Sequence, residues 1–304
     1  MSLLTLPASE FEPGAEGTFA LPASIYHSQV MAPGISRTLV VELLQLSPAH
    51  AKTLLDGTYH KRETPAMVGG TMVDLALLEP DKFQEGLSHW VVPSGMNLAT
   101  KEGIAWKKDH PGLPRIRATS DAENTVSVEN IHGMIESLMK SPKVRRIIEQ
   151  GTKQESAFAL DPETGLMRKV RSDVRLVDNQ SRLVITDLKS TFRGGTSSEA
   201  WRKHCARMAY HIQDSFYSHV YQSLTGEMPF FLFIAVERKP PYAVRLFQLD
   251  PEGKECGRTR CQIAMYQFRQ CIDSGLWPAF NDDIETISLP KWELAAPDPE
   301  PIDI

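Results

Sequence analysis

The chain has 304 residues, of which 41% are hydrophobic and 23% charged, with a formal net charge of −5. This composition is close to the globular average and excludes wholesale disorder, a collagen-like chain and a coiled coil. No apolar run approaches the ~18 residues that a membrane-spanning helix needs, and no secretory signal is visible, so we expect a cytoplasmic protein. Four cysteines in so long a chain predict neither a disulfide scaffold nor a zinc site.

The first half of the chain predicts helices that follow an N-terminal arm. Residues 1–24 show no hydrophobic period and predict a flexible arm. Residues 81–128 favour no single structure. Apolar residues spaced by three and four, with capping residues before them, predict helices over residues 36–46, 47–55, 71–78 and 129–150. The last of these is expected to break and restart at Ser141-Pro142.

From residue 154 onward the hydrophobic period becomes that of strands. Strands are predicted over residues 154–160, 167–177, 182–189, 229–236 and 242–249. Helices are predicted from Ser198 to just before Gly226, with one continuous apolar stripe, and over residues 257–274. This order predicts an α/β fold with a mixed central sheet flanked by helices. We expect one domain over residues 25–293 and a C-terminal tail over 294–304.

The positive charge of the chain is concentrated in one stretch. Residues 140–210 hold 15 Lys or Arg and 8 Asp or Glu, a local excess of seven positive charges in an otherwise acidic protein. Such a stretch is typical of a site for a polyanion. Charge alone would favour an ordinary solvated surface, so the prediction depends on the motifs that the stretch contains.

The third predicted strand ends in Asp187-Leu188-Lys189. Side chains alternate along a strand, so Asp187 and Lys189 share one face and Leu188 points into the core. The turn after the second strand brings Asp173 alongside, and two adjacent carboxylates need a cation to stay ionised together. We expect Asp173, Asp187 and the Leu188 carbonyl to hold Mg²⁺, or Mn²⁺ in its place, at a sheet edge. Lys189 would orient a water or stabilise charge on a phosphate.

Other residues are candidates for the same site. Glu155, on the first strand, fits a further metal ligand or a water-positioning base, and it fits an exposed strand residue equally well. Gln213 and Tyr217 lie four residues apart on one helix face and, with Arg207, could hold phosphate oxygens. Ordinary helix surface is the alternative. Arg193, just after the Asp187-Leu188-Lys189 strand, is the candidate for a phosphate contact.

The order E…D…D-x-K…Q-x-x-x-Y resembles the PD-(D/E)xK nuclease superfamily and its RecB-like branch. The resemblance is greatest to the RecE-type exonucleases of phages and prophages (exodeoxyribonuclease VIII-like), and it covers about residues 25–293. The strings that carry it include Ile35-Ser36-Arg37, Gly70-Thr71, Glu155-Ser156, Arg171-Ser172-Asp173, Asp187-Leu188-Lys189-Ser190-Thr191, His211-Ile212-Gln213, Trp277-Pro278 and Leu289-Pro290-Lys291-Trp292.

The resemblance implies a restriction-endonuclease-like α/β core and a specific activity. By resemblance the protein is a Mg²⁺-dependent 5′→3′ exonuclease that digests linear double-stranded DNA from its free ends. It would release 5′-mononucleotides and leave 3′ overhangs for annealing-type recombination. The resemblance also implies a homotetrameric ring, a RecT-like single-strand-annealing recombinase as partner, and a phage- or prophage-encoded protein in the bacterial cytoplasm.

Two departures from the family pattern matter. The family usually has proline before the first aspartate, where this chain has Ser172. The family's Gly-Thr-x-x-His places a histidine where this chain has Asp74, so either Asp74 joins the metal site, which we expect, or it is only a helix-face carboxylate. Two alternatives stay open: a RecB-like nuclease of another polarity, and a DNA-binding subunit without catalysis.

Overall fold

One mixed β-sheet runs through the protein. The computed structural model describes residues 3–60, 64–110, 115–120, 126–280 and 284–294. Within these residues the sheet has eight strands in the spatial order β1-β2-β4-β5-β6-β7-β8, and β3 pairs separately with β5. The strands are β1 (Thr5–Pro7), β2 (Gly17–Ala20), β3 (Ile35–Ser36), β4 (Thr152–Leu160), β5 (Met167–Val177), β6 (Leu183–Thr191), β7 (Phe230–Glu237) and β8 (Val244–Phe247).

The strands predicted between residues 154 and 189 form the centre of this sheet. β4, β5 and β6 are antiparallel neighbours, whereas β6 and β7 run parallel. A parallel pair needs a long crossover, and α9 (Ser198–Arg207) and α10 (Tyr210–Thr225) supply it. The predicted α/β fold with a mixed sheet flanked by helices is therefore confirmed.

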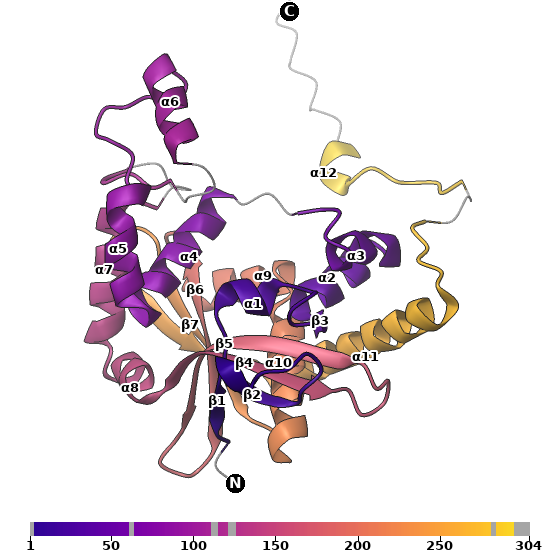
Figure 1. Cartoon of the computed structure of the whole chain (residues 1–304). Coiled ribbons are helices and arrows are strands. Elements are labelled where there is room, and N and C mark those ends of the chain that lie inside the picture. Colours follow the sequence, from indigo (N-terminus) through magenta and orange to yellow (C-terminus); the bar gives the residue numbers. More distant parts are fainter. Residues whose placement is uncertain (1–2, 61–63, 111–114, 121–125, 281–283, 295–304) are drawn as a thin grey trace, which may run out of the picture.

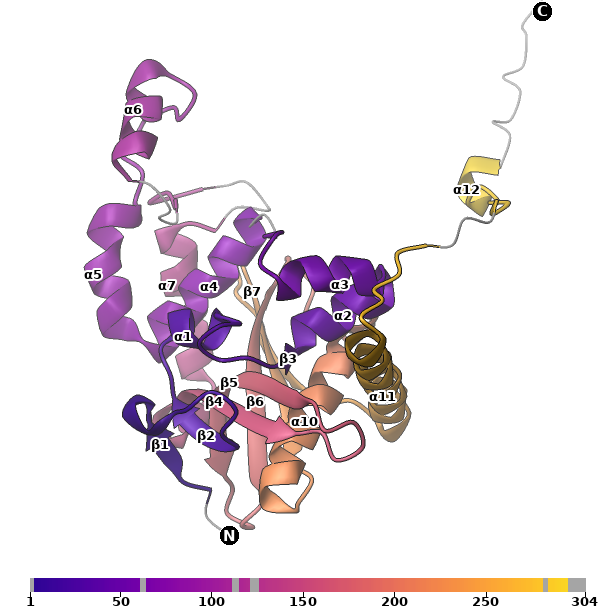
Figure 2. The same cartoon turned by 45° about the vertical axis from the view of Figure 1, so that its right-hand side comes forward.

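Helices cover both faces of the sheet (Figure 1), and the turned view in Figure 2 shows the same layers. The helices on the α10 side are α2 (Arg37–Gln45), α3 (Pro48–Leu55) and α11 (Pro251–Ser274). Those on the other side are α4 (Pro65–Leu78), α5 (Pro80–Trp90), α7 (Val128–Lys140) and α8 (Pro142–Gln150). Each side has its own hydrophobic core, with Phe216 and Phe231 in one and Ile131 and Met134 in the other.

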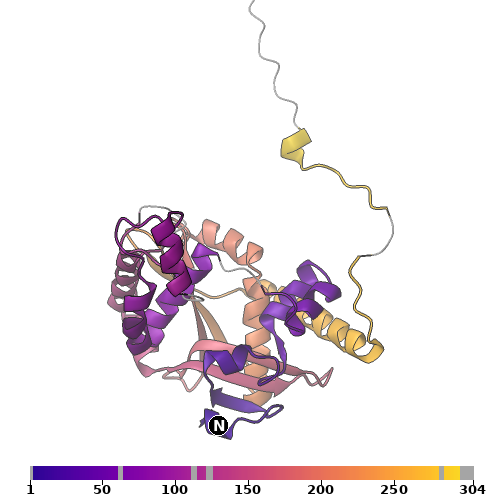
Figure 3. The same cartoon turned by 45° about the horizontal axis from the view of Figure 1, so that its top comes forward.

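Two parts of the chain project from these layers. α6 (Lys101–Asp109) extends beyond α5, and the segment after α11 leads away from the body to α12 (Lys291–Leu294), as Figures 1 and 3 show. The predicted C-terminal tail from residue 295 lies outside the described residues. None of the helices described is both long and apolar enough to span a membrane.

Local capping explains where several helices begin. The Ser47 hydroxyl accepts a hydrogen bond from the His50 amide, with Pro48 at the first helical position, as predicted for α3. Ser127 and Asn130 cap α7 reciprocally. Asp250 caps α11 by accepting from the Gly253 amide at 2.7 Å. α11 therefore begins at Pro251, earlier than the predicted start at residue 257.

The helix predicted from Ser198 to Gly226 is in fact two helices. Ala209, between α9 and α10, has a left-handed backbone with a φ of +53°. The Arg37 guanidinium donates to the carbonyls of Met208 and Ala209 at this break, where the Ala209 carbonyl also accepts from the Ile212 amide at 3.1 Å. Trp201 and Phe216 lie in the same core on either side of the break, so the apolar stripe continues across it. Hydrophobic spacing alone could not show the break for that reason.

The N-terminal residues belong to the sheet, and the predicted flexible arm over residues 1–24 is wrong for the described part. β1 pairs with β2, and β2 pairs antiparallel with β4. Phe19 is 1% exposed and packs with Phe11 and Phe158 in a separate apolar cluster. A few aromatic residues supply this burial without any periodic pattern, so hydrophobic spacing does not indicate it.

The central strands diverge at the place where the predicted motif residues lie. β5 and β6 are paired only from Val174 and Thr186 to Val177 and Leu183. Beyond Val174, β5 continues beside β3 and β4, and β6 continues beside β7. The motif residues therefore lie at a fork in the middle of the sheet, and the expected location at a sheet edge is wrong.

Candidate active site

The residues of the D…D-x-K motif meet at this fork. The Asp173 carboxylate accepts a hydrogen bond from the Leu188 amide, with 2.6 Å between Oδ2 and N. Asp187 is 4% exposed, forms an ion pair with Lys189 and accepts a hydrogen bond from the Gln213 side-chain amide. The Leu188 side chain points into the opposite core. Strand alternation and the hairpin thus produce the arrangement that the sequence predicts.

These side chains line a cavity of about 570 Å³. Its walls come from α2, α4, β5, β6 and α10, and they include Asp74 and Tyr217 together with the aspartates and the lysine of the motif. A cavity in which several polar groups converge is the expected form of a binding or catalytic site.

Four acidic residues line this cavity, and the carboxyl groups of three of them, Asp74, Asp173 and Asp187, affect one another, while Glu79 is the fourth. Burial, then the neighbouring Asp187, raises the pKa of Asp173 to about 7, although Lys189 and the Leu188 amide act in the opposite direction. Burial, then Asp173, raises the pKa of Asp74 well above its ordinary value. The three carboxyl groups are therefore close enough for the charge on one to raise the pKa of another, and a nearby cation would favour their ionised forms.

Lys189 has a polar neighbour on one side and an aromatic neighbour on the other. Its ammonium pairs with Asp187 and lies 5.2 Å from the centre of the Tyr210 ring. Burial lowers the pKa of Lys189, but Asp187, Tyr210 and Asp173 outweigh burial and raise it overall. The amine is therefore held as a cation beside the carboxylates.

The donor set fits a hard divalent cation. Mg²⁺ is usually bound through one or two carboxylates and keeps several waters. Asp173 and Asp187 offer two such carboxylates, and the Asp74 carboxyl lines the same cavity. In the described residues no three His, Cys, Asp or Glu side chains form a group that could hold a metal ion by themselves.

α10 brings two predicted residues to the cavity. Gln213 and Tyr217 both line it, as their four-residue spacing predicts. α11 packs closely against α10: a Cβ atom on Gly257 would lie 2.0 Å from the His211 carbonyl oxygen. Only glycine permits this close approach of α11 to the backbone of α10.

Glu155 does not line the cavity. Its carboxylate is fully buried and forms a two-point ion pair with Arg175, at 2.6 and 2.9 Å, and it accepts hydrogen bonds from Thr5 and Tyr221. Glu155 is in register with Ser172, which also contacts the Tyr221 hydroxyl, so both project away from the cavity. We therefore do not include Glu155 in the proposed metal site.

Arg193 and Arg207 also lie outside the cavity. Arg193 is exposed after β6 and donates from Nε to the Pro240 carbonyl at 3.2 Å. Arg207 is exposed at the end of α9, where it lies 3.4 Å from the His204 ring nitrogen Nδ1. Their predicted contact with DNA phosphates stays a prediction.

The basic residues between positions 140 and 210 include both buried and exposed side chains. Arg168, Lys169 and Arg175 are buried and bind groups of their own chain, whereas Arg202 and Lys203 are exposed on α9. Three of the fifteen basic residues in this stretch are therefore buried and structural. Counting charges along the sequence could not separate these two groups.

The sequence reasoning missed three basic residues of the cavity wall. Lys169, Arg171 and Asp173 occupy every second position of β5, so their side chains lie on the same face of the strand, and all three line the cavity. Lys169 donates to the Ala32 carbonyl at 2.6 Å and to the Tyr26 carbonyl at 3.0 Å, and burial lowers its pKa to about 8. The period-two spacing was the available signal for Lys169 and Arg171. Arg37, which supports the α9–α10 break, showed no such signal.

Comparison with solved structures gives the same fold. The crystal structure of a "putative exonuclease" from Eubacterium rectale superposes with a TM-score of 0.59 and 13% sequence identity, covering 91% of this chain and 98% of that one. The structure of SSO0001 covers 76% of this chain at a TM-score of 0.28 and 10% identity, which is too low to carry an argument. No curated protein sequence matches.

Comparison with protein families is more specific. The family described as a PDDEXK-like domain of unknown function, DUF3799, matches residues 36–290. This range contains the fork, most of the cavity lining and every residue of the D…D-x-K and Q-x-x-x-Y motifs. The chain therefore belongs to this PDDEXK-like family.

Proposed function

We propose that this protein is a Mg²⁺-dependent 5′→3′ exonuclease acting on linear double-stranded DNA. It would release 5′-mononucleotides and leave 3′ overhangs for annealing-type recombination. The observation that carries the proposal is the gathering of Asp173, Asp187, Lys189 and Gln213 in one cavity. The family and the fold support a nuclease. The duplex substrate and the direction come from the resemblance to RecE-type exonucleases.

The acidic residues define the metal-holding part of the proposed site. Asp173, Asp187 and the Leu188 carbonyl would hold the ion, with Asp74 beside them, and Mn²⁺ would substitute for Mg²⁺. When bound, such an ion lowers the pKa of a coordinated water and neutralises charge on a phosphate. Asp74 takes the place of the family histidine, so it adds negative charge where an imidazole would add none.

The other residues of the site would orient the attacking water, the Asp187 carboxylate and the phosphate oxygens. The Lys189 ammonium would orient the attacking water or stabilise charge on the phosphate oxygens in the transition state. The Gln213 amide fixes one oxygen of Asp187. Burial raises the pKa of Tyr217 well above its ordinary value, so its hydroxyl stays protonated and can donate to a phosphate oxygen.

The assembly and partners follow from the same resemblance. We propose a homotetrameric ring around the DNA and a RecT-like single-strand-annealing recombinase that takes up the 3′ overhang, both in the cytoplasm of a bacterial host. The exposed basic residues of α9 support contact with a DNA backbone without sequence reading.

A digestion assay on labelled DNA tests the proposal. Linear duplex labelled at the 5′ or the 3′ end is incubated with protein and Mg²⁺, and a closed circle of the same sequence is the control. We expect early release of the 5′ label as a mononucleotide and an intact circle. Early release of the 3′ label would mean the opposite polarity, and cutting of the circle an endonuclease. Tight binding without release would mean a non-catalytic DNA-binding subunit.

A further inference from the structure

A chain of aromatic contacts leads from Lys189 to a second cavity. The Lys189 ammonium lies over Tyr210, and the Tyr210 and His204 ring centres are 5.5 Å apart, with 3.4 Å between the hydroxyl and Nε2. His204 in turn meets Phe192 edge to face, with 6.3 Å between ring centres and 80° between ring planes. Phe192 directly follows β6 and lies three residues after Lys189 in the chain. The second cavity is therefore close to the proposed catalytic lysine.

This second cavity, of about 400 Å³, lies between Phe192 and α9. Phe192 is 37% exposed although it adjoins a buried strand, and His204 forms the adjacent wall. Burial, then Arg207, lowers the pKa of His204, so its ring is neutral at pH 7. The rings of Phe192 and His204 thus form two nearly perpendicular walls of the cavity, and the Phe192 ring is partly exposed to solvent.

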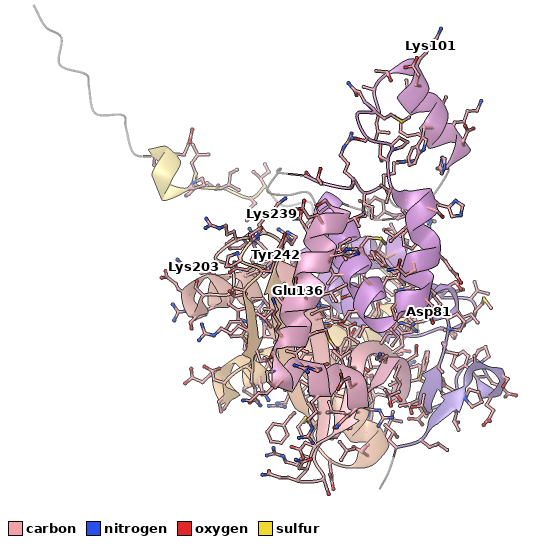
Figure 4. All side chains as sticks on the ribbon, turned by 90° about the vertical axis from the view of Figure 1, so that its left-hand side faces the viewer. Asp81, Lys101, Glu136, Lys203, Lys239 and Tyr242 are labelled. Atoms are coloured by element: carbon pink, nitrogen blue, oxygen red, sulfur yellow. The ribbon has the colours of Figure 1, made fainter. Side chains whose placement is uncertain are left out.

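The rim of this cavity carries two basic residues, Lys203 and Arg207, and one acidic residue, Glu199. Lys203 and Arg207 lie one helical turn apart on α9, and both are exposed. Figure 4 shows Lys203 extending outward from α9. By contrast Lys239, beside α7, is buried and donates to the Ser120 carbonyl at 2.6 Å. Lys203 pairs with Glu199 at 2.8 Å, but that pair is on the surface and is weak.

We propose that the cavity between Phe192 and α9 binds an unstacked nucleobase of the DNA strand held at the active site. This inference rests on the proposed nuclease function and adds a substrate class to it, DNA ends with unpaired nucleotides. An exposed aromatic face beside basic side chains is the combination that binds single-stranded nucleic acid, because the base stacks and the phosphates pair with the cations. Lys203 and Arg207 hold the neighbouring phosphates.

The test compares tails with and without a base. The probe is a duplex with a short 5′ single-stranded tail that carries 2-aminopurine at one position, and its partner probe has an abasic site there. Binding is measured with Ca²⁺ in place of Mg²⁺, with the strand checked for integrity. For the unaltered protein we expect a change in 2-aminopurine fluorescence and about tenfold weaker binding of the abasic tail, the usual effect of losing one stacked base.

Substitutions of Phe192 test whether the base binds in this cavity. Phe192→Ala and Phe192→Leu are expected to remove the preference for the base, and Phe192→Trp to keep it, each with an unchanged melting temperature. Phe280→Ala, which removes another exposed phenylalanine, is the matched control and should behave as the unaltered protein.

The outcomes separate this inference from the nuclease proposal. Equal binding of both tails by the unaltered protein, or an undiminished preference in Phe192→Ala, would overturn the base-binding site while digestion of duplex DNA continued. Absence of both DNA binding and digestion would overturn the two proposals together.

Discussion

Asp173 on β5 accepts its hydrogen bond from the backbone amide of Leu188 on β6, across the point where the two strands separate. The contact holds the carboxylate beside Asp187 although the regular strand pairing ends at Val174 and Thr186. The fork therefore does two things: it opens the cavity, and it keeps the two acidic residues together at its base.

Replacing Lys189 should separate binding from turnover. We predict that Lys189→Ala lowers nucleotide release from linear duplex by roughly 100-fold or more, because a cation beside the reacting phosphate is lost. DNA binding, measured by fluorescence anisotropy, should stay within a few-fold. Lys143→Ala, on the exposed face of α8, is the control and should digest normally. Unaltered cleavage by Lys189→Ala would refute the assigned role.

Removing the carboxylates should remove metal binding. In the unaltered protein, added Mn²⁺ should raise the melting temperature, since a ligand that binds only the folded state stabilises it, and EDTA should reverse this. Asp173→Asn and Asp187→Asn should lose the Mn²⁺ effect. Asp273→Asn, exposed on α11, should keep it. An undiminished Mn²⁺ effect in both site variants would place the ion elsewhere.

Substitutions of Asp74, which stands where the family has a histidine, test whether this residue joins the metal site. If its carboxylate joins the metal site, Asp74→Asn should weaken Mn²⁺ affinity by roughly tenfold or more, measured by titration calorimetry. Asp74→His should then restore much of the affinity, because an imidazole can serve as a ligand in its place. Unchanged affinity in Asp74→Asn would show that Asp74 is only a carboxylate on the face of α4.

Glu155 should matter for stability more than for chemistry. Breaking its buried ion pair leaves Arg175 without a charged partner, so Glu155→Gln should lower the free energy of unfolding by about 3–5 kcal/mol. The folded fraction should still digest DNA at a normal rate. Chemical denaturation and activity at low temperature measure the two effects. Lost activity with unchanged stability would restore Glu155 to the active site.

Asp214 should make stability depend on pH. Its carboxyl is 1% exposed, and burial raises its pKa to about 6 in the folded state from an ordinary 3.8. The folded state then holds the proton more tightly, so this contribution is fully present below pH 3.8 and is lost as pH rises through 6. We predict a cost of up to about 3 kcal/mol at pH 7.

The variant Asp214→Asn isolates this contribution. Its free energy of unfolding should lack the decline between pH 4 and pH 6 that the unaltered protein shows in urea denaturation. Parallel pH profiles of the two proteins would contradict the prediction.

Periodic patterns predicted the parts of the fold on which the site depends. The bounds of β5 match the predicted 167–177, and alternation along β6 placed Asp187 and Lys189 on one face. The spacing of Gln213 and Tyr217 placed both on the cavity wall. These features follow from local geometry, which the order of apolar and polar residues encodes directly.

The features that the sequence did not predict depend on contacts between distant residues. Arg175 lies 20 positions from Glu155, and only the strand register brings them together. Phe19 packs on Phe158 with no periodic pattern around either residue. The left-handed Ala209 is supported by Arg37, which is far away in the chain. Tertiary contacts of this kind leave no periodic signal in one sequence.

A crystal soaked in Mn²⁺, with the anomalous signal used to locate the ion, tests whether the carboxylates at the fork hold a metal. We expect an ion between the carboxylates of Asp173 and Asp187, next to the Leu188 carbonyl, with Lys189 beside it. A crystal that binds Mn²⁺ elsewhere, or binds none while these two carboxylates stay ordered, would contradict it.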